Sequence, residues 1–136
     1  MQSKEVKAFK NRLRYYAFLK DEIHSLEQKI EDLYDRLGGV RGVDPSKEPM
    51  HAMPNKEVEW KVRELISKLD ADLSHRLREK DEIDQILFRM ETDDREAVIA
   101  VYVQGNHCDK VARQHHMSPS GLKSRMDRQI KKALQQ

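Results

Sequence analysis

Apolar residues recur at helical spacing along the first part of the chain. They lie seven residues apart, and a second set follows the middle members by three residues: Phe9, Tyr16, Ile23, Ile30 and Leu37, then Leu19, Leu26 and Leu33. This a/d spacing is typical of a helix that packs along one seam against a partner helix. Charged residues occupy most of the positions between, so we expect one long helix whose other faces meet solvent.

A long connecting segment follows at residues 38–54. Gly38 and Gly39 favour the end of a helix, because glycine adopts the left-handed conformation at little cost. The segment has no helical period and also contains Gly42, Pro45, Pro49 and Pro54. Proline removes a backbone donor and interrupts helices. We therefore expect a Gly/Pro-rich loop here.

A second apolar stripe begins after this loop, where Asn55 can cap the start of a helix. The stripe comprises Val58, Val62, Leu65, Leu69, Leu73, Leu77, Ile83, Leu87 and Met90. Its spacing is less regular around residues 72–80, because Arg76 and Lys80 fall near seam positions. We therefore expect a second long helix with a stutter or a bend.

The two long helices can be arranged in two ways. They could fold back on each other as a hairpin, or each could pair with its copy in another subunit. A two-helix hairpin alone buries only one thin seam, so we expect oligomerisation to complete the core. A homodimer is the least demanding assembly, with a higher homo-oligomer as the alternative.

Shorter segments begin at Glu91. Thr92 or Asp93 can cap a helix, and Asp93 with Glu96 forms an acidic variant of the capping box. The apolar residues of this helix are Ala97, Val98, Ala100, Val101 and Tyr102, and it ends at Gly105. In the next segment, residues 106–115, Val111 and Ala112 should point inward, where alanine allows a second helix to cross closely.

The last segment has the layout of the second helix of a helix-turn-helix. His116 and Met117 make a corner, with Met117 filling the core, and Ser118 caps a helix whose first residue is Pro119. Its buried stripe repeats every four residues, at Leu122, Met126, Ile130 and Leu134. Other positions, including Asp127, should face outward. The candidate DNA-binding residues are Ser118, Ser120, Gly121, Lys123, Ser124, Arg125, Arg128, Lys131 and Lys132.

These candidates divide by position along the helix. Residues near its start, Ser120, Gly121, Lys123 and Ser124, are placed to approach base edges in a DNA major groove. The remaining cations, Arg125, Arg128, Lys131 and Lys132, are better suited to phosphates.

Composition and charge support a helical fold with a basic C-terminal segment. The 136 residues are 38% hydrophobic and 37% charged, with only five glycines, so we expect an all-α protein of long one-sided helices. The net charge is +2, but residues 106–136 hold seven basic and two acidic residues, which sum to +5 and leave −3 for the rest. A basic terminal module suits phosphate binding.

Several classes of protein are disfavoured. One cysteine, Cys108, excludes an internal disulfide, and without a signal peptide or a long apolar stretch we expect a cytoplasmic location in a bacterial host cell and no membrane contact. The motif His107-Cys108 and the pair His115-His116 invite a metal hypothesis, but zinc sites need four well-spaced ligands, so we favour surface histidines. No nucleophile–base pair or phosphate loop emerges, so we expect neither cofactor nor enzyme activity.

The first twenty residues are basic and aromatic. They carry Lys4, Lys7, Lys10, Arg12, Arg14 and Lys20 against Glu5 alone. One interpretation is a second nucleic-acid contact. The other, an amphipathic helix whose aromatic residues pack and whose lysines are solvated, is the one we favour.

The run from Met117 to Arg128 resembles the recognition-helix motif of region 4 of bacterial sigma factors, especially the extracytoplasmic-function type. Residues 94–96, Tyr102, Gly105 and Val111-Ala112 also match that module. His107 stands where that family usually has Ser or Thr, so Asn106 would cap instead, and His116 stands where it usually has glycine. The chain has no counterpart of the sigma region that melts promoters.

The whole layout is similar to phage and prophage regulators of the ArpU and RinA kind. We accordingly expect a helical oligomerisation region at residues 1–90 and a helix-turn-helix domain at residues 91–136. The resemblance implies a transcription regulator that binds double-stranded DNA as an oligomer. Two alternatives stay open: a small-terminase-like DNA-packaging protein, and a sigma-like factor that binds host RNA polymerase.

Overall fold

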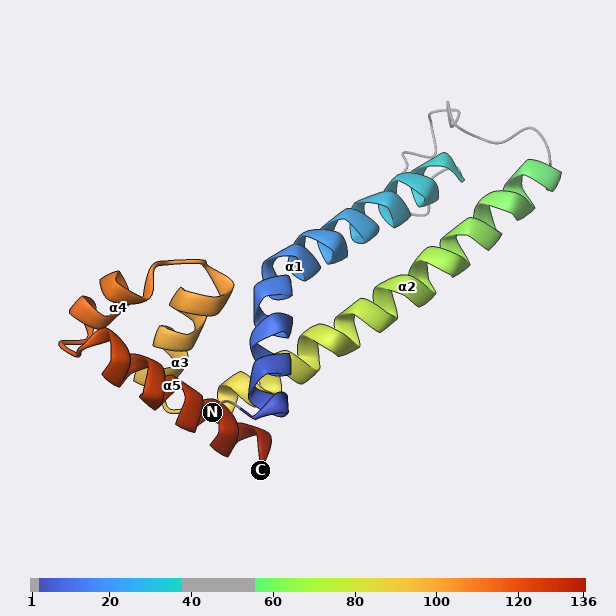
Figure 1. The fold of residues 1–136 in the computed structure, drawn as a ribbon. Helices are drawn as coiled ribbons and strands as arrows, with labels where there is room; N and C mark the ends of the chain where they lie inside the picture. Colours follow the sequence, from blue (N-terminus) through green and yellow to red (C-terminus); the bar gives the residue numbers. More distant parts are fainter. Residues whose placement is uncertain (1–2, 38–55) are drawn as a thin grey trace. The chain divides into compact units, whose positions relative to one another are not determined.

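The structure is a computed structural model that describes residues 3–37 and 56–136. Every regular element in these two ranges is helical: α1 (Lys4–Arg36), α2 (Lys56–Phe88), α3 (Thr92–Val98), the π-helical segment η1 (Ile99–Val103), α4 (Cys108–Gln114) and α5 (Pro119–Leu134) (Figure 1). The expected all-α fold, two long helices packed as a hairpin and followed by short C-terminal helices, is confirmed. The predicted loop at 38–54 and the Asn55 cap lie outside the described residues.

The chain divides into two compact units. We call Asp21–Arg78 the stalk unit, and we call Met1–Lys20 together with Glu79–Gln136 the head unit. The head unit therefore holds the first turns of α1 and the end of α2 besides the four C-terminal elements, whereas the sequence-based boundary lies between residues 90 and 91. Shared packing explains this grouping, as described below.

In the stalk unit, α1 and α2 pack along one apolar seam. Its buried centre is Ile30, Leu33 and Ile66, and around it pack Tyr34, Leu37, Val62, Leu69 and Leu73. Further along, the guanidinium of Arg76 lies 3.2 Å from the carboxylate of Glu22. The seam thus combines aliphatic contacts with a half-buried ion pair.

Of the two alternatives predicted for α2, a stutter or a bend, the stutter is absent. The helix is uninterrupted over its 33 residues, and its seam advances in alternating steps of four and three through Val62, Ile66, Leu69, Leu73, Arg76, Lys80, Ile83, Leu87 and Met90. Val58, Leu65 and Leu77, which the sequence pattern assigned to the seam, are exposed by 43%, 45% and 43%. At Leu77 the assignment was wrong because Arg76 holds the seam position, where its aliphatic stem packs while its guanidinium pairs with Glu22. At Leu65 the neighbouring Ile66 is the buried residue.

The head unit has one core built by both ends of the chain. Its buried apolar residues are Val6, Phe9, Leu13, Leu19, Ile83, Leu87, Met90, Ala97, Val98, Tyr102, Val111, Ala112, Leu122, Met126, Ile130 and Ala133. Arg95 joins two elements of this unit, because its guanidinium donates to the carbonyls of Leu87 and Met90, each at 3.1 Å. The Leu87 carbonyl, which also accepts from the N–H of Met90 at 3.1 Å, and the Met90 carbonyl just beyond α2 thus share one cationic donor that ties α3 to the end of α2.

Helix ends in the head unit follow the expectations only in part. Ser118 caps α5 as predicted, since its Oγ accepts from the N–H of Gly121 at 3.1 Å and Pro119 is the first helical residue. At α3 the cap residue is Glu91, not Thr92 or Asp93, and its side chain makes no capping bond. At α4 the cap is His107, whose Nδ1 accepts from the N–H of Asp109 at 3.3 Å. The prediction that Asn106 caps this helix in place of residue 107 is therefore wrong. The imidazole nitrogen of His107 can accept a hydrogen bond as a Ser or Thr hydroxyl would.

None of the described helices is both long and apolar enough to span a membrane.

Candidate nucleic-acid interface

Helices α4 and α5 are joined by the short turn at residues 115–118, and they pack against each other. Within the turn, His116 has a positive φ of 57°, and the N–H of Met117 donates to the carbonyl of Ala112 at 2.9 Å. Val111 and Ala112 are buried as predicted. A larger residue at 112 would separate the two helices, so alanine helps to set their close approach.

One side of α5 is buried in the head. Leu122, Met126 and Ile130 form the predicted stripe, and Ala133 completes it. Leu134, predicted as the fourth member, is only half-buried. The stripe turns by a step of three residues at its end, because the helix period of 3.6 does not sustain steps of four.

The opposite side of α5 is a row of exposed polar side chains. Ser120, Ser124, Arg128 and Lys131 are all exposed and follow at spacings of four, four and three residues, so they share one face. We call them the outer face of α5. Within the described part of the chain, none of these four side chains makes an ion pair or side-chain hydrogen bond, which leaves their polar groups available to a ligand.

Arg125 lies at one edge of this face and already has a partner. Its Nε is 2.6 Å from Oδ1 of Asp94, whose side chain is only 5% exposed. The predicted role of Arg125 in phosphate binding therefore competes with a structural one, since the guanidinium neutralises a buried carboxylate of α3.

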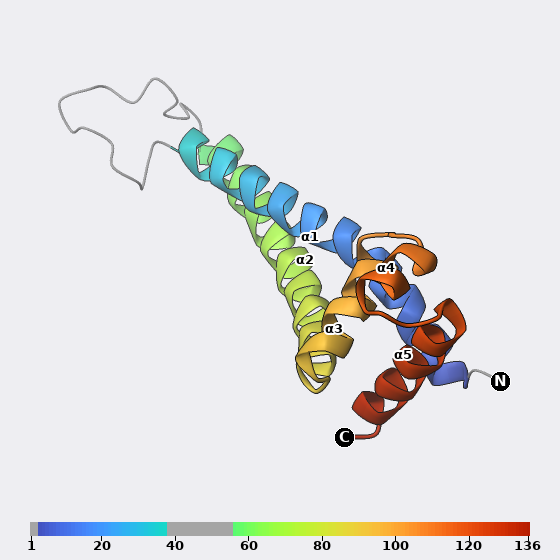
Figure 2. The ribbon, with the colours of Figure 1, turned by 90° about the vertical axis from the view of Figure 1, so that its left-hand side faces the viewer.

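Asp127 corrects a second expectation, because it does not simply face outward. Its carboxylate lies 2.5 Å from the ammonium of Lys10, whose side chain is 4% exposed. The ion pair joins α1 to α5, and Figure 2 shows the first turns of α1 beside α5. Lys10 therefore departs from the favoured interpretation of the basic N-terminus, which expected its lysines to be solvated: its ammonium is buried and paired with an aspartate.

Two candidates near the start of α5 have structural roles. Ser118 is exposed but engaged in the cap. A Cβ added to Gly121 would lie 2.9 Å from the Oγ of Ser118, so the capping bond itself accounts for glycine at this position. The other candidates, Lys123 and Lys132, are exposed.

The histidines of the described segments do not converge on a metal site. Over residues 3–37 and 56–136, no group of three or more His, Cys, Asp or Glu side chains could hold an ion. His107 is used in the cap of α4, and Cys108 is a half-buried free thiol.

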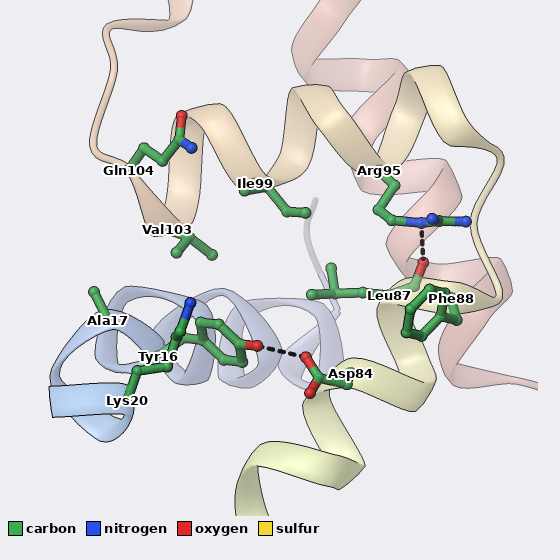
Figure 3. Close-up of a pocket in the computed structure, with 10 residues that line it drawn as sticks. All are labelled: Tyr16, Ala17, Lys20, Asp84, Leu87, Phe88, Arg95, Ile99, Val103 and Gln104. Carbon is green, nitrogen blue, oxygen red and sulfur yellow. Dashed lines mark hydrogen bonds between the residues drawn. The ribbon is translucent and has the colours of Figure 1, made fainter. Parts of the chain in front are cut away.

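A separate apolar hollow of about 400 Å³ lies in the head unit between α1, α2 and the α3–η1 segment (Figure 3). Leu87, Ile99 and Val103 point into it. At its rim, the Tyr16 hydroxyl donates to Oδ1 of Asp84 at 2.5 Å, and the Lys80 ammonium donates to Oδ2 of the same carboxylate at 2.8 Å.

This cluster raises the pKa values of two of its side chains, Tyr16 and Lys80. Burial, reinforced by the Asp84 carboxylate, raises the pKa of Tyr16 above its ordinary value, while the hydrogen bond to Asp84 raises the pKa of Lys80. Because both pKa values are higher in the folded state, protonated Tyr16 and protonated Lys80 each stabilise the fold at neutral pH. This stabilisation is lost as the pH rises through the folded-state pKa values, above about pH 10.

We therefore expect the melting temperature to fall in alkaline solution, measured by circular dichroism between neutral pH and about pH 11. Tyr16→Phe should lower the neutral-pH stability by about 1 kcal/mol, because the hydrogen bond to Asp84 is lost. In this variant the melting temperature should also fall less steeply between neutral pH and about pH 11. Tyr34→Phe, in the stalk unit, is the control; an equal effect of both substitutions would contradict the role of the cluster.

Comparison of the chain with protein-family models, with curated proteins and with solved structures found no significant match.

Proposed function

We propose that the protein is a sequence-specific DNA-binding regulator of transcription that inserts α5 into the major groove. The observation that carries this proposal is the outer face of α5, a row of exposed side chains opposite a buried stripe on a capped helix. A recognition helix needs this combination, because rigid support from the core keeps the contacting side chains in place.

The chemistry of the outer face suits base edges and phosphates. Arginine forms bidentate hydrogen bonds with guanine, and serine hydroxyls donate to or accept from any base pair. Lys131 and Lys132 lie in the last turn of α5, where they would contact the DNA backbone. The excess positive charge of residues 106–136 adds long-range attraction to phosphate.

The resemblance to sigma region 4 and to phage regulators of the ArpU and RinA kind supports the same function. Oligomerisation is part of the proposal, because the stalk unit exposes apolar side chains beyond its own seam. Trp60 is 64% exposed, and Val58 and Leu65 lie seven residues apart on one side of α2. A second copy that covers them would bring two heads to one DNA site.

The test is selection of duplexes from a random-sequence library, followed by affinity measurements on the selected duplex and on unrelated DNA. Ser124→Ala/Arg128→Ala should lower affinity for the selected duplex by about 10-fold or more, since it removes one base contact at Ser124, worth about 1 to 3 kcal/mol, and one phosphate contact at Arg128. Ser74→Ala/Arg78→Ala is the matched control, because the same residue pair lies exposed at the same spacing on α2.

Three results would point away from this function. Failure of the wild-type protein to enrich any sequence would refute sequence-specific binding. A ring-sized mass in solution would favour the DNA-packaging alternative over a dimeric regulator. Retention of RNA polymerase by the Ser124→Ala/Arg128→Ala variant, without any DNA binding by the wild type, would favour the sigma-like alternative.

A further inference from the structure

A second hollow, of about 370 Å³, lies in the head unit and is lined by residues of α1, η1, α4 and α5. It is lined in part by Val101 and Tyr102 of η1 and by Cys108 of α4. The remaining lining residues are all basic: Lys7, Lys10, Arg14 and Lys123. None of the described residues that line it is acidic. We call it the basic hollow.

The cations of this hollow come from two elements that are distant in the sequence. Lys4, Lys7, Asn11 and Arg14 are exposed and follow at steps of three, four and three, so they form one face of α1. Lys123 comes from α5 and immediately precedes Ser124 of the outer face. The basic hollow therefore adjoins the surface that we assign to DNA.

The four lining cations differ in how much charge they can offer. Lys10 is buried and paired with Asp127, so it anchors α1 and adds little net charge. Arg14 donates to Oδ1 of Asn11 at 2.9 Å, and its guanidinium carbon lies 5.8 Å from the centre of the Tyr102 ring. Both of these partners are neutral and leave its charge intact. Lys7, Arg14 and Lys123 thus concentrate positive charge around one concavity.

We propose that the basic hollow binds backbone phosphates of the same DNA duplex that α5 contacts, so that the first turns of α1 form part of the DNA-binding surface. This inference rests on the proposed function and extends it. Charge complementarity supports this occupant, because phosphates provide a row of anions and Lys123 is shared between the hollow and the recognition helix. The basic N-terminus is then more than a packing helix.

The salt dependence of binding isolates this contribution. Each phosphate contact makes the slope of log K against log salt concentration more negative by about 0.9, without changing sequence preference. On the duplex selected by the wild-type protein, Lys7→Ala should therefore make this negative slope shallower by about 1, and Lys7→Ala/Arg14→Ala should make it shallower by about 2. The ratio of specific to non-specific affinity should stay at its wild-type value.

A matched control removes two charges elsewhere. Lys20→Ala/Lys61→Ala changes two exposed lysines that do not line the hollow, and it should keep the wild-type slope. Thermal unfolding checks that each variant is folded. The single Lys7→Ala variant keeps the test valid if the loss of Arg14 from Tyr102 disturbs the head.

The outcomes separate the two proposals. A wild-type slope in both Lys7→Ala and the double variant, with specific DNA binding intact, overturns the basic hollow and leaves the proposed function standing. If the Lys20→Ala/Lys61→Ala control changes the slope as much as the hollow variants do, the effect is one of general charge, and the proposal of the basic hollow is also overturned. Absence of DNA binding by the wild-type protein overturns both.

Discussion

Asp127→Ala should lower the free energy of unfolding of the head unit by about 3 to 5 kcal/mol, because it leaves the ammonium of Lys10 buried without its counter-charge. The side chain of Lys10 is 4% exposed and lies 2.5 Å from the carboxylate that would be removed. Its ammonium also lies 5.1 Å from the centre of the Tyr102 ring, but a ring face compensates only part of an ionic interaction. Urea unfolding monitored by circular dichroism measures the loss.

Two further variants identify the cause of this loss. Lys10→Met/Asp127→Ala removes both charges and keeps an unbranched apolar chain, so its stability should lie within about 1 kcal/mol of the wild type. Asp35→Ala is a control that removes an exposed carboxylate from α1, the helix that carries Lys10. It should change the free energy of unfolding by less than about 0.5 kcal/mol. If the double variant is no more stable than Asp127→Ala, an unpaired buried charge is not the explanation.

Ile130→Ala should lower the free energy of unfolding by about 2 to 5 kcal/mol, since it removes three methyl or methylene groups from the centre of the head core and leaves a cavity. The side chain is 0% exposed and belongs to the buried stripe of α5. Specific DNA affinity should fall as well, because the same stripe supports the outer face. Chemical unfolding and the affinity assay on the selected duplex measure the two effects.

Leu134→Ala is the matched control for this substitution. Leu134 lies one turn further along α5 and is only half-buried, so its truncation should cost clearly less than that of Ile130. Equal losses at the two positions would contradict the assignment of Ile130 to the centre of the core.

Local features of the candidate interface were predictable from the sequence. Ser118 and Pro119 mark the start of α5 within two residues, and the spacing of Leu122, Met126 and Ile130 identifies its buried side. Once that side is known, the opposite face follows from the helix period alone. The outer face could therefore be derived without coordinates.

Local sequence patterns do not predict which side chains meet across the fold. Arg125 was assigned to phosphate, but Asp94 of α3 binds it. Asp127 was assigned to the surface, but Lys10 of α1 binds it. In α2, the charged residues Arg76 and Lys80 concealed an unbroken seam. An ion pair depends on which helix faces meet, and a charge looks the same in a sequence whether water or a partner satisfies it.

What the sequence by itself determined is thus the set of helices, most of their apolar faces and the cap of α5, because backbone hydrogen bonds and helical periodicity act over a few neighbouring residues. What only the tertiary structure decided is the pairing of the two ends of the chain. Packing joins the first turns of α1 to α5 and creates both the buried Lys10–Asp127 pair and the basic hollow beside Lys123. These features depend on contacts between distant segments, and no local pattern encodes them.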